Sequence, residues 1–350
     1  MIIKNLSVKT VIKPLKVLFS TSLGSKEEMM SVLVKITLDN GSYGLGECPT
    51  SFVSKLETIE AIKEILTYTK KQIQNKPIED FEEIVQFLRR RFFMYPMTVS
   101  GIEVALFRAY LNVIGIDEYT YWGARLKNLE TDITIPFLTD LNAINSWLNY
   151  GIKKGFKIFK LKLSGDVIQD ILLLSKVNEI LNDSTSSHTI RLDGNQGFTE
   201  KTFLKLQDIM EKKGYIIQCF EQPLKKNDFS GMKVIKKYSH IPIILDETVF
   251  SSCELNRVIS ENICDGVNIK VAKSGILESK RMIEIAKRHK LKLMIGCMTE
   301  TMIGLSAGIY LACGTGQFDF VDLDSIYYIR HKRNYGNINL VPPFFFINWA

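Results

Sequence analysis

The sequence predicts an α/β fold in which a parallel β/α barrel carries a small second domain. Short apolar runs end in a charged residue, and a stretch long enough for a helix follows each of them, which is the pattern of repeated β/α units. Eight strand candidates, several of them with such a charged end, follow one another at fairly regular spacing, and this favours a barrel over an open sheet. The chain has 350 residues, whereas a bare barrel needs about 250. One barrel plus a cap accounts for the length.

The N-terminal part, residues 1–125, is predicted to form the second domain. β-rich stretches come first, at 1–15, 29–41 and 42–49, and Asp39-Asn40-Gly41 is a turn signal between the last two. Stretches with apolar residues at helical spacing follow, at 58–74, 78–93 and 100–116. We therefore expect an α+β unit before the barrel.

The barrel is predicted for residues 126–325, because the sequence changes near residue 132 to alternating strand and helix patterns. The strand candidates lie at 133–138, 157–163, 189–193, 216–221, 242–246, 265–270, 291–296 and 318–323. In a parallel barrel the carboxyl ends of all strands open on one face. Charged residues at these ends are expected to converge there.

The composition argues against several classes of function. The net charge is +7, but the lysines are scattered rather than gathered with aromatic residues in one patch, so no nucleic-acid partner is expected. No stretch reaches the roughly 20 apolar residues of a membrane span. The six cysteines form no CxxC pair, which indicates free thiols. We expect a cytoplasmic protein with no membrane partner.

Three carboxylates end consecutive predicted strands. Asp193 lies in TIRLDGNQG, Glu221 in IIQCFEQP and Asp246 in IPIILDET. At one barrel face they would repel one another unless a cation neutralised them. Ligation by oxygen alone favours Mg²⁺ over zinc, with Mn²⁺ as an alternative. The sequence therefore predicts a metal site with these three residues as its ligands.

Lysines flank these carboxylates in the chain. Lys160 and Lys162 lie in KIFKLKL before them, and Lys270 lies in GVNIKVAKSG after them. A metal can stabilise the enolate that forms when a proton leaves the carbon next to a carboxylate. A lysine can carry that proton once positive charge and burial lower its pKa from about 10.4. Lysines on opposite faces of the enolate would invert a stereocentre, so racemisation or epimerisation is the expected reaction.

Six ordered segments give the chain a resemblance to a known family. KIFKLKL, LDGNQG, FEQP, LDET, NIKVAKSG and GCMTET resemble the enolase superfamily and, within it, the muconate-lactonising subgroup, and GLGECP extends the resemblance to the N-terminal domain. The resemblance implies an α+β capping domain on a modified (β/α)7β TIM-type barrel. It also implies that the final segment, residues 326–350, returns to the cap. The ending NLVPPFFFINWA departs from the glycine-rich ending of the family.

The resemblance assigns roles to the residues already singled out. Lys162 and Lys270 would be the acid and the base. Lys160 would lie on the same strand face as Lys162, hold the substrate carboxylate and lower the pKa of Lys162. Asn195 and Glu247 follow two of the metal ligands closely and would orient the site.

Members of the subgroup share this machinery and differ in reaction, so the last predicted strand becomes decisive. FDFVDLDS places Asp322 and Asp324 on one strand face, and the pair resembles the carboxylates with which dipeptide epimerases hold the substrate ammonium. Thr134 and Cys297, the latter through its backbone N–H, are further candidate substrate contacts. The expected function is dipeptide epimerisation. The alternatives are a cycloisomerase, an o-succinylbenzoate synthase or a non-catalytic binding protein on the same scaffold.

The preferred dipeptide depends on the cap loops. Relatives that act on Ala-Glu can place a cation in the first cap loop, where STSLGSKEE has Gly24, and Lys26 is the candidate to meet a glutamate side chain instead. Phe19, Phe52 and Val53 would suit an apolar side chain. The net charge and the need of cells to recycle cell-wall peptides favour L-Ala-D/L-Glu. The expected partners are a small dipeptide and, in a homo-oligomer, further copies of the chain.

Overall fold

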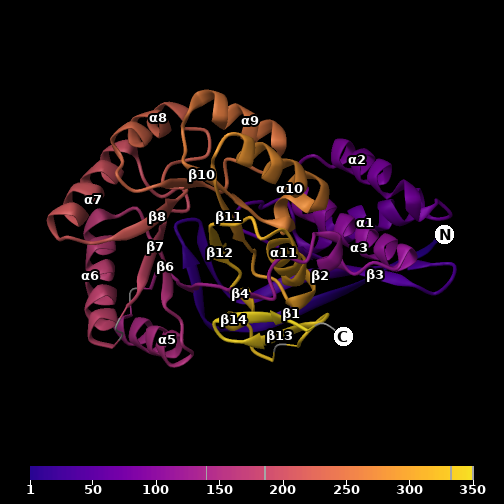
Figure 1. Cartoon of the computed structure of the whole chain (residues 1–350), viewed down its shortest axis with the longest axis horizontal. Helices are drawn as coiled ribbons and strands as arrows, with labels where there is room; N and C mark the ends of the chain where they lie inside the picture. The colour runs from indigo at the N-terminus through magenta and orange to yellow at the C-terminus, as the bar shows by residue number, and fades with distance from the viewer. Residues whose placement is uncertain (139, 185–186, 332, 349–350) are drawn as a thin grey trace.

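Parallel strands with helices on their outer side form one part of the molecule, and the cap lies beside them (Figure 1). The computed structural model describes residues 1–138, 140–184, 187–331 and 333–348. Within this part of the chain, eight parallel strands form one sheet in the order β12-β11-β10-β9-β8-β7-β6-β5. They are β5 (Ile133–Ile135), β6 (Ile158–Lys162), β7 (Thr189–Asp193), β8 (Ile217–Glu221), β9 (Ile243–Leu245), β10 (Gly266–Ile269), β11 (Lys292–Gly296) and β12 (Phe320–Asp322).

A helix follows each strand from β5 to β11 and lies on the outer side of the sheet (Figure 1). These helices are α5 (Leu141–Lys153), α6 (Val167–Ser184), α7 (Glu200–Lys212), α8 (Phe229–Tyr238), α9 (Ser252–Glu261), α10 (Val271–Arg288) and α11 (Met302–Thr315); the short α12 (Ser325–Tyr328) follows β12. The segment just before β5 is hydrogen-bonded to the end of β12, since Leu323 N donates to Thr131 Oγ1 at 2.8 Å and Asp132 N donates to Val321 O at 3.4 Å. The predicted barrel architecture is confirmed.

The strand ends fix the position of the charged residues. Asp193 and Glu221 are the last residues of β7 and β8, while Asp246 and Lys270 come directly after β9 and β10. The predicted strands overlap all eight observed ones and extend past some of them by up to a few residues. The extra residues lie at both ends of the observed strands, in the adjoining loops.

The cap contains an antiparallel sheet and a set of helices. Its strands are β1 (Ile3–Thr21), β2 (Gly24–Leu38) and β3 (Tyr43–Pro49), and its helices are α1 (Ile59–Ile73), η1 (Ile78–Asp80), α2 (Phe81–Arg91), α3 (Pro96–Ile114) and α4 (Glu118–Tyr121). Most of the buried apolar residues of cap and barrel form one continuous cluster. Glu47 of β3 accepts hydrogen bonds from Thr301 N at 3.0 Å and Gly304 N at 3.1 Å, which ties the cap to the loop after β11.

Helix α3 is the central helix of the cap. It packs against β3 of the cap and α10 of the barrel. By length and composition it is the one helix of the described residues that could cross a membrane, and 78% of its most apolar window is buried inside the molecule. Burial in the core accounts for its apolar character.

The C-terminal residues form a second small antiparallel sheet. β13 (Ile338–Val341) pairs with β14 (Phe344–Ile347), which pairs with β4 (Asn128–Glu130). Just before them, Arg330 N donates to Pro14 O in β1 at 3.0 Å, so the chain does contact the cap. Because segments on both sides of residues 125 and 325 pack together, these domain boundaries stay predictions.

Candidate active site

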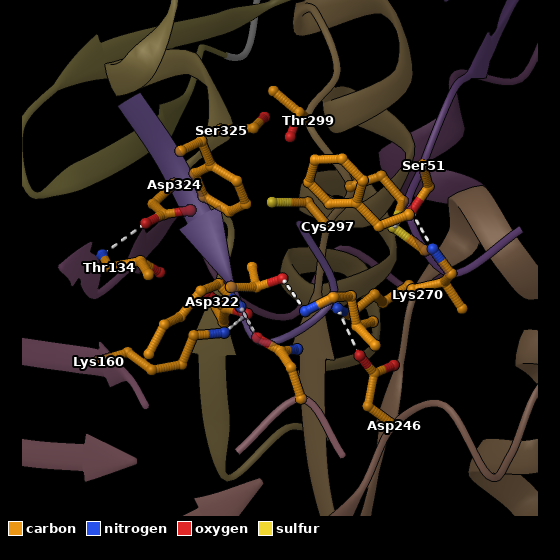
Figure 2. A pocket seen from close by; sticks show the side chains of 18 of the residues that line it. Ser51, Thr134, Lys160, Asp246, Lys270, Cys297, Thr299, Asp322, Asp324 and Ser325 are labelled. Atoms are coloured by element: carbon orange, nitrogen blue, oxygen red, sulfur yellow. Dashed lines mark hydrogen bonds and ion pairs between the residues drawn. The ribbon is translucent and has the colours of Figure 1, made fainter. Parts of the chain in front are cut away.

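The carboxyl ends of the barrel strands and two cap loops enclose a pocket (Figure 2). The predicted residues that line it are Lys26, Thr134, Lys160, Lys162, Asn195, Asp246, Glu247, Lys270, Cys297, Asp322 and Asp324. Asp193 and Glu221 lie just beneath this lining and are fully buried. All the site residues predicted from the sequence therefore meet at one end of the barrel.

The three predicted metal ligands are held by lysines and an amide. Asp193 Oδ2 accepts from Lys162 Nζ at 2.7 Å, and Asp246 Oδ2 accepts from Lys270 Nζ at 2.8 Å. Glu221 Oε1 accepts from Asn268 Nδ2 at 2.7 Å and lies 3.9 Å from Lys270 Nζ. The two lysines thus contact different members of the carboxylate set.

Lys160 lies at the centre of the carboxylates. Its Nζ is 3.2 Å from Glu221 Oε2 and 3.8 Å from Asp193 Oδ2, and it donates a short hydrogen bond to Asp322 Oδ2. Only 2% of the residue is exposed. Its ammonium group is therefore engaged with protein carboxylates, and the predicted contact with a substrate carboxylate stays a prediction.

Burial and mutual charge perturb these groups strongly. Burial and the charge of Asp193 raise the pKa of Glu221 to about 7. Burial opposes the charge of Asp246, but Lys270 and Lys273 outweigh it and lower the pKa of this carboxyl. Burial also opposes the charge of Lys270, yet Asp246 and Glu221 prevail and raise its pKa. The charges of Asp246 and Glu221 thus favour the charged form of Lys270.

The carboxylate set fits a hard divalent cation. All the donors are oxygens, the three residues are at most 1% exposed, and burial together with the charge of Asp193 already raises the pKa of Glu221. A divalent ion relieves such repulsion, and Mg²⁺ prefers oxygen donors. Asp193, Glu221 and Asp246 are therefore suited to hold it.

Asn195 and Glu247 connect the two sides of the site. Asn195 Oδ1 accepts from Lys162 Nζ at 3.0 Å, its backbone N donates to Asp193 Oδ1 at 2.9 Å, and its Nδ2 donates to Glu247 Oε1 at 3.2 Å. Burial and Asp246 raise the pKa of Glu247 to about 8, and its Oε2 has no hydrogen-bond partner among the described residues. The hydrogen bonds agree with the orienting role predicted for both residues.

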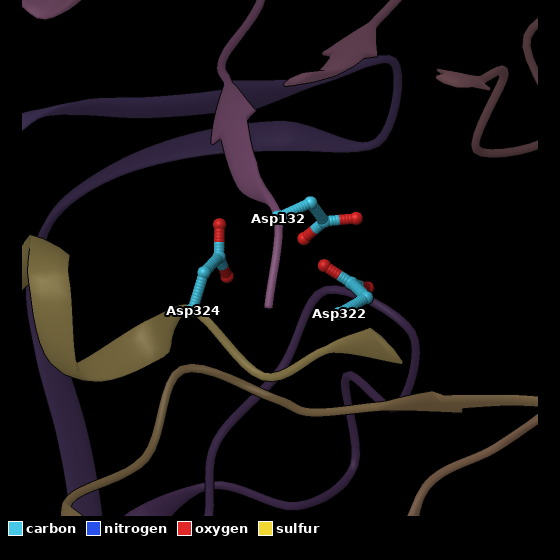
Figure 3. A group of neighbouring side chains, drawn as sticks. All are labelled: Asp132, Asp322 and Asp324. Carbon is cyan, nitrogen blue, oxygen red and sulfur yellow. The ribbon is translucent and has the colours of Figure 1, made fainter. Parts of the chain in front are cut away.

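A second group of carboxylates lies on the β12 side of the pocket. Oxygens of Asp132, Asp322 and Asp324 lie within 4.8 Å of one another, and Figure 3 shows the three side chains directed towards a common centre. Asp324 Oδ2 accepts from Thr134 N at 2.6 Å. Burial and Asp322 raise the pKa of Asp324 to about 6. This group is separate from the predicted metal ligands and is suited to bind a cation.

The cap side of the pocket combines one lysine with apolar side chains. Lys26 Nζ lies 5.9 Å from the ring centre of Phe19 and 5.6 Å from that of Phe52. Burial lowers the pKa of Lys26 to about 8. Val53 and Met298 complete this wall. The side chain that enters here would meet both a cation and an apolar surface.

Lys273, Asn268 and Asp132 contribute to the site and were not predicted from the sequence. Lys273 is fully buried and donates to Asp246 O and Oδ1, both at 2.6 Å. Asn268 lies in β10, two residues before Lys270, which directly follows the strand, so strand alternation could have identified it. Asp132 precedes β5 and carries no comparable signal.

Two family models match the chain. Residues 146–340 match the model described as enolase C-terminal domain-like, and residues 4–112 match the N-terminal domain of mandelate racemase and muconate lactonizing enzyme. An L-Ala-D/L-Glu epimerase from Thermotoga maritima is 30% identical over 298 residues, which cover 85% of each chain.

Solved structures give the same picture. A substrate-liganded complex of the L-Ala-D/L-Glu epimerase from Bacillus subtilis has a TM-score of 0.92 at 26% identity, and the match covers 99% of this chain and 97% of that one. A dipeptide epimerase from Enterococcus faecalis, complexed with Mg and L-Leu-L-Tyr, has a TM-score of 0.91 at 25% identity over 100% of this chain and 98% of that one. One of these neighbours is thus named for a dipeptide that contains glutamate, and the other holds a dipeptide of leucine and tyrosine.

Proposed function

Because the chain belongs to the mandelate racemase and muconate lactonizing enzyme family of the enolase superfamily, we propose that it is a dipeptide epimerase, as its relatives are named. The observation that carries the proposal is the placement of three groups in one pocket. Lys162 and Lys270 contact different carboxylates, and Asp322 and Asp324 stand beside them. A base, a second base and an anionic subsite are what inversion at the α-carbon of a dipeptide requires.

Asp193, Glu221 and Asp246 would hold Mg²⁺, or Mn²⁺ in its place, whose charge stabilises the enolate formed from the substrate. One of Lys162 and Lys270 takes the α-proton and the other returns a proton to the opposite face. Asp246 and Glu221 raise the pKa of Lys270 in the protein alone. A cation held by these carboxylates would weaken that stabilisation and so make Lys270 a better base.

The substrate is oriented by charge at both ends of the pocket. Asp322 and Asp324 would accept hydrogen bonds from the ammonium group, with Asp324 fixed by Thr134 N. Thr134 and Cys297 would add contacts from the wall. Lys26 would meet a side-chain carboxylate, which favours L-Ala-D/L-Glu over purely apolar dipeptides. Such an enzyme would serve cell-wall peptide metabolism in the cytoplasm.

A dipeptide library in deuterated water tests the proposal directly. Only a residue that loses its α-proton gains deuterium, so mass gain reports both the reaction and its specificity. We expect incorporation at the C-terminal residue of Ala-Glu with Mg²⁺ present, and loss of incorporation with excess chelator or in Asp193→Asn, Glu221→Gln and Asp246→Asn. Absence of exchange from every dipeptide would contradict the function, and full exchange in chelator would contradict the metal.

A further inference from the structure

A third carboxylate stands behind the pair that faces the substrate. Asp132 is fully buried, and its Oδ2 accepts from Arg191 Nη1 at 2.8 Å. Its other oxygen, Oδ1, has no hydrogen-bond partner among the described residues, and neither has Asp322 Oδ1. In Figure 3, Asp132 and Asp322 point towards each other, with Asp324 facing the same space. Two buried acceptor oxygens in this group are thus left without a donor.

The charges around Asp132 do not balance within the protein. The charged groups that face it are Asp322 and Asp324 from the β12 side, Arg191 from β7 and Lys160 from β6. Three carboxylates therefore share two cations, and Lys160 also serves Glu221 at 3.2 Å. Buried charge without compensation is costly. One further positive charge would complete the group.

A proton on Asp132 would relieve the imbalance where no ammonium group lies against Asp322 and Asp324. Burial and the charge of Asp322 hold the pKa of Asp132 well above its usual range. An ammonium group placed against Asp322 and Asp324 favours the ionised form of the carboxylate behind them. A neutral, acylated N-terminus supplies no such charge. Asp132 thus increases the difference in affinity between dipeptides with a free ammonium group and dipeptides with an acylated N-terminus.

We propose that Asp132 is a positioning residue of the ammonium subsite, which acts through Asp322 and selects dipeptides with a free N-terminus. This rests on the proposed dipeptide substrate. Asp132 does not line the pocket, whereas Asp322 and Asp324 do, so it acts without touching the ligand. Arg191 holds it in place by a second bond to the backbone, from Nη1 to Val321 O at 2.8 Å, directly before Asp322.

The test compares Asp132→Asn with a matched control, Asp319→Asn. Asparagine keeps the size of the side chain and removes its charge. Asp319 precedes β12, the strand that ends at Asp322, and its Oδ2 accepts from Leu293 N at 2.8 Å, away from the pocket lining. Calorimetry with Mg²⁺ present measures the binding of Ala-Glu and of N-acetyl-Ala-Glu to each protein, and deuterium exchange gives KM and kcat for both.

We expect Asp132→Asn to raise the Kd and KM of the free dipeptide about tenfold, which is about 1.4 kcal/mol, with a smaller change in kcat. The acetylated form should be unaffected, and Asp319→Asn should resemble wild type. Equal weakening of both ligands, or an unchanged Kd for the free one, would overturn the proposal. So would a second bound Mn²⁺ that Asp132→Asn removes, because the group would then be a metal site.

Two further comparisons keep the result interpretable. If Asp132→Asn does not fold, Asp132→Glu keeps the charge and should retain discrimination between free and acetylated dipeptides; its loss would count against the proposal. Binding is measured apart from turnover. A wild-type chain that prefers free dipeptides but exchanges no α-proton would therefore refute the epimerase function and leave the role of Asp132 intact.

Discussion

At the scale of single residues, the two proposed bases are held independently. Lys162 contacts Asp193 and Asn195, whereas Lys270 contacts Asp246 and lies near Glu221. Removing one lysine therefore leaves the partners of the other in place. Variants that lack one lysine can therefore separate exchange of the α-proton from full epimerisation.

Lys162→Ala and Lys270→Ala should each abolish epimerisation, because one face of the enolate loses its proton donor. Each variant should still exchange the α-proton of the one diastereomer that its remaining lysine reaches. Mass spectrometry in deuterated water, with separate L,L and L,D substrates, measures both. Lys→Arg at either position should also fail, because arginine does not act as a base near neutral pH. Epimerase turnover retained in either alanine variant would refute the assignment.

The pKa of Lys26 makes a second prediction at this scale. Burial lowers this pKa to about 8, so in the free enzyme the ammonium loses its proton as the pH rises through that value. Each further pH unit lowers the ratio of charged to neutral Lys26 about tenfold. Both dipeptides also lose the ammonium group that Asp322 and Asp324 would bind, since an α-amino group titrates at about pH 8. We therefore expect KM for Ala-Glu to rise more steeply above about pH 8 than KM for Ala-Leu.

Ala-Leu is the internal control, because both substrates depend on the same lysine bases. Lys26→Met should show a high KM for Ala-Glu at every pH and leave Ala-Leu little changed. Parallel pH profiles for the two dipeptides in wild type would show that Lys26 does not read the side chain. The aromatic wall of Phe19 and Phe52 would then decide specificity.

The residues predictable from sequence are those whose placement follows from strand position alone. Asp193, Glu221 and Lys270 stand at strand ends, and parallel strands bring such ends together. Lys273 was not predictable, since its reach to Asp246 depends on α10 beginning directly after Lys270. The engagement of Lys160 by Asp322 depends on the opposite edges of the sheet meeting. Long-range closure of this kind leaves no local pattern.

At the scale of secondary-structure elements, the cap depends on a close approach between α3 and β3. A methyl group at Gly46 would overlap the carbonyl oxygen of Gly101 and lie 3.0 Å from Ala105 N. Neither backbone atom can move without shifting the helix. The strand and the helix are thus in contact through their main chains.

Gly46→Ala should therefore destabilise the cap by about 2 kcal/mol or more, because overpacking against backbone forces the elements apart. Thermal unfolding measures the effect. Gly41→Ala is the matched control: its added methyl meets no atom within 4 Å, and only its positive φ of 83° is strained. It should cost about 1 kcal/mol. If Gly46→Ala were no more destabilising than Gly41→Ala, the close approach of β3 and α3 would not require a glycine at position 46.

Element boundaries were predictable where a local signal exists. The turn at Asp39-Asn40-Gly41 lies between β2 and β3 as expected. Helix α3 begins at Pro96, four residues before the predicted start at residue 100, because proline suits the first helical position. The strands β13 and β14 were not predicted. The pairing of β14 with β4 joins residues more than 200 positions apart, and short apolar runs do not indicate such partners.

At the scale of the whole molecule, the site concentrates charge inside the barrel. Lys160, Lys162, Lys270 and Lys273 are at most 7% exposed, and the carboxylates they contact are at most 2% exposed. Buried ion pairs contribute little net stability, yet the loss of one partner is costly, about 3 to 5 kcal/mol. Folding and metal binding are therefore expected to be linked.

Mg²⁺ should stabilise the wild-type chain, because binding to the native state alone shifts the unfolding equilibrium. At one hundred times the Kd the gain is about 2.7 kcal/mol, which calorimetric melting with and without chelator measures as a higher Tm. Asp246→Asn should lower the Tm without metal, since Lys270 and Lys273 lose their shared partner, and it should abolish the shift on adding Mg²⁺. Asp319→Asn, outside the site, should keep the full shift. An unchanged Tm shift in Asp246→Asn would mean that the stabilising cation binds elsewhere, for which the separate carboxylate group of Asp132, Asp322 and Asp324 would be the first place to look.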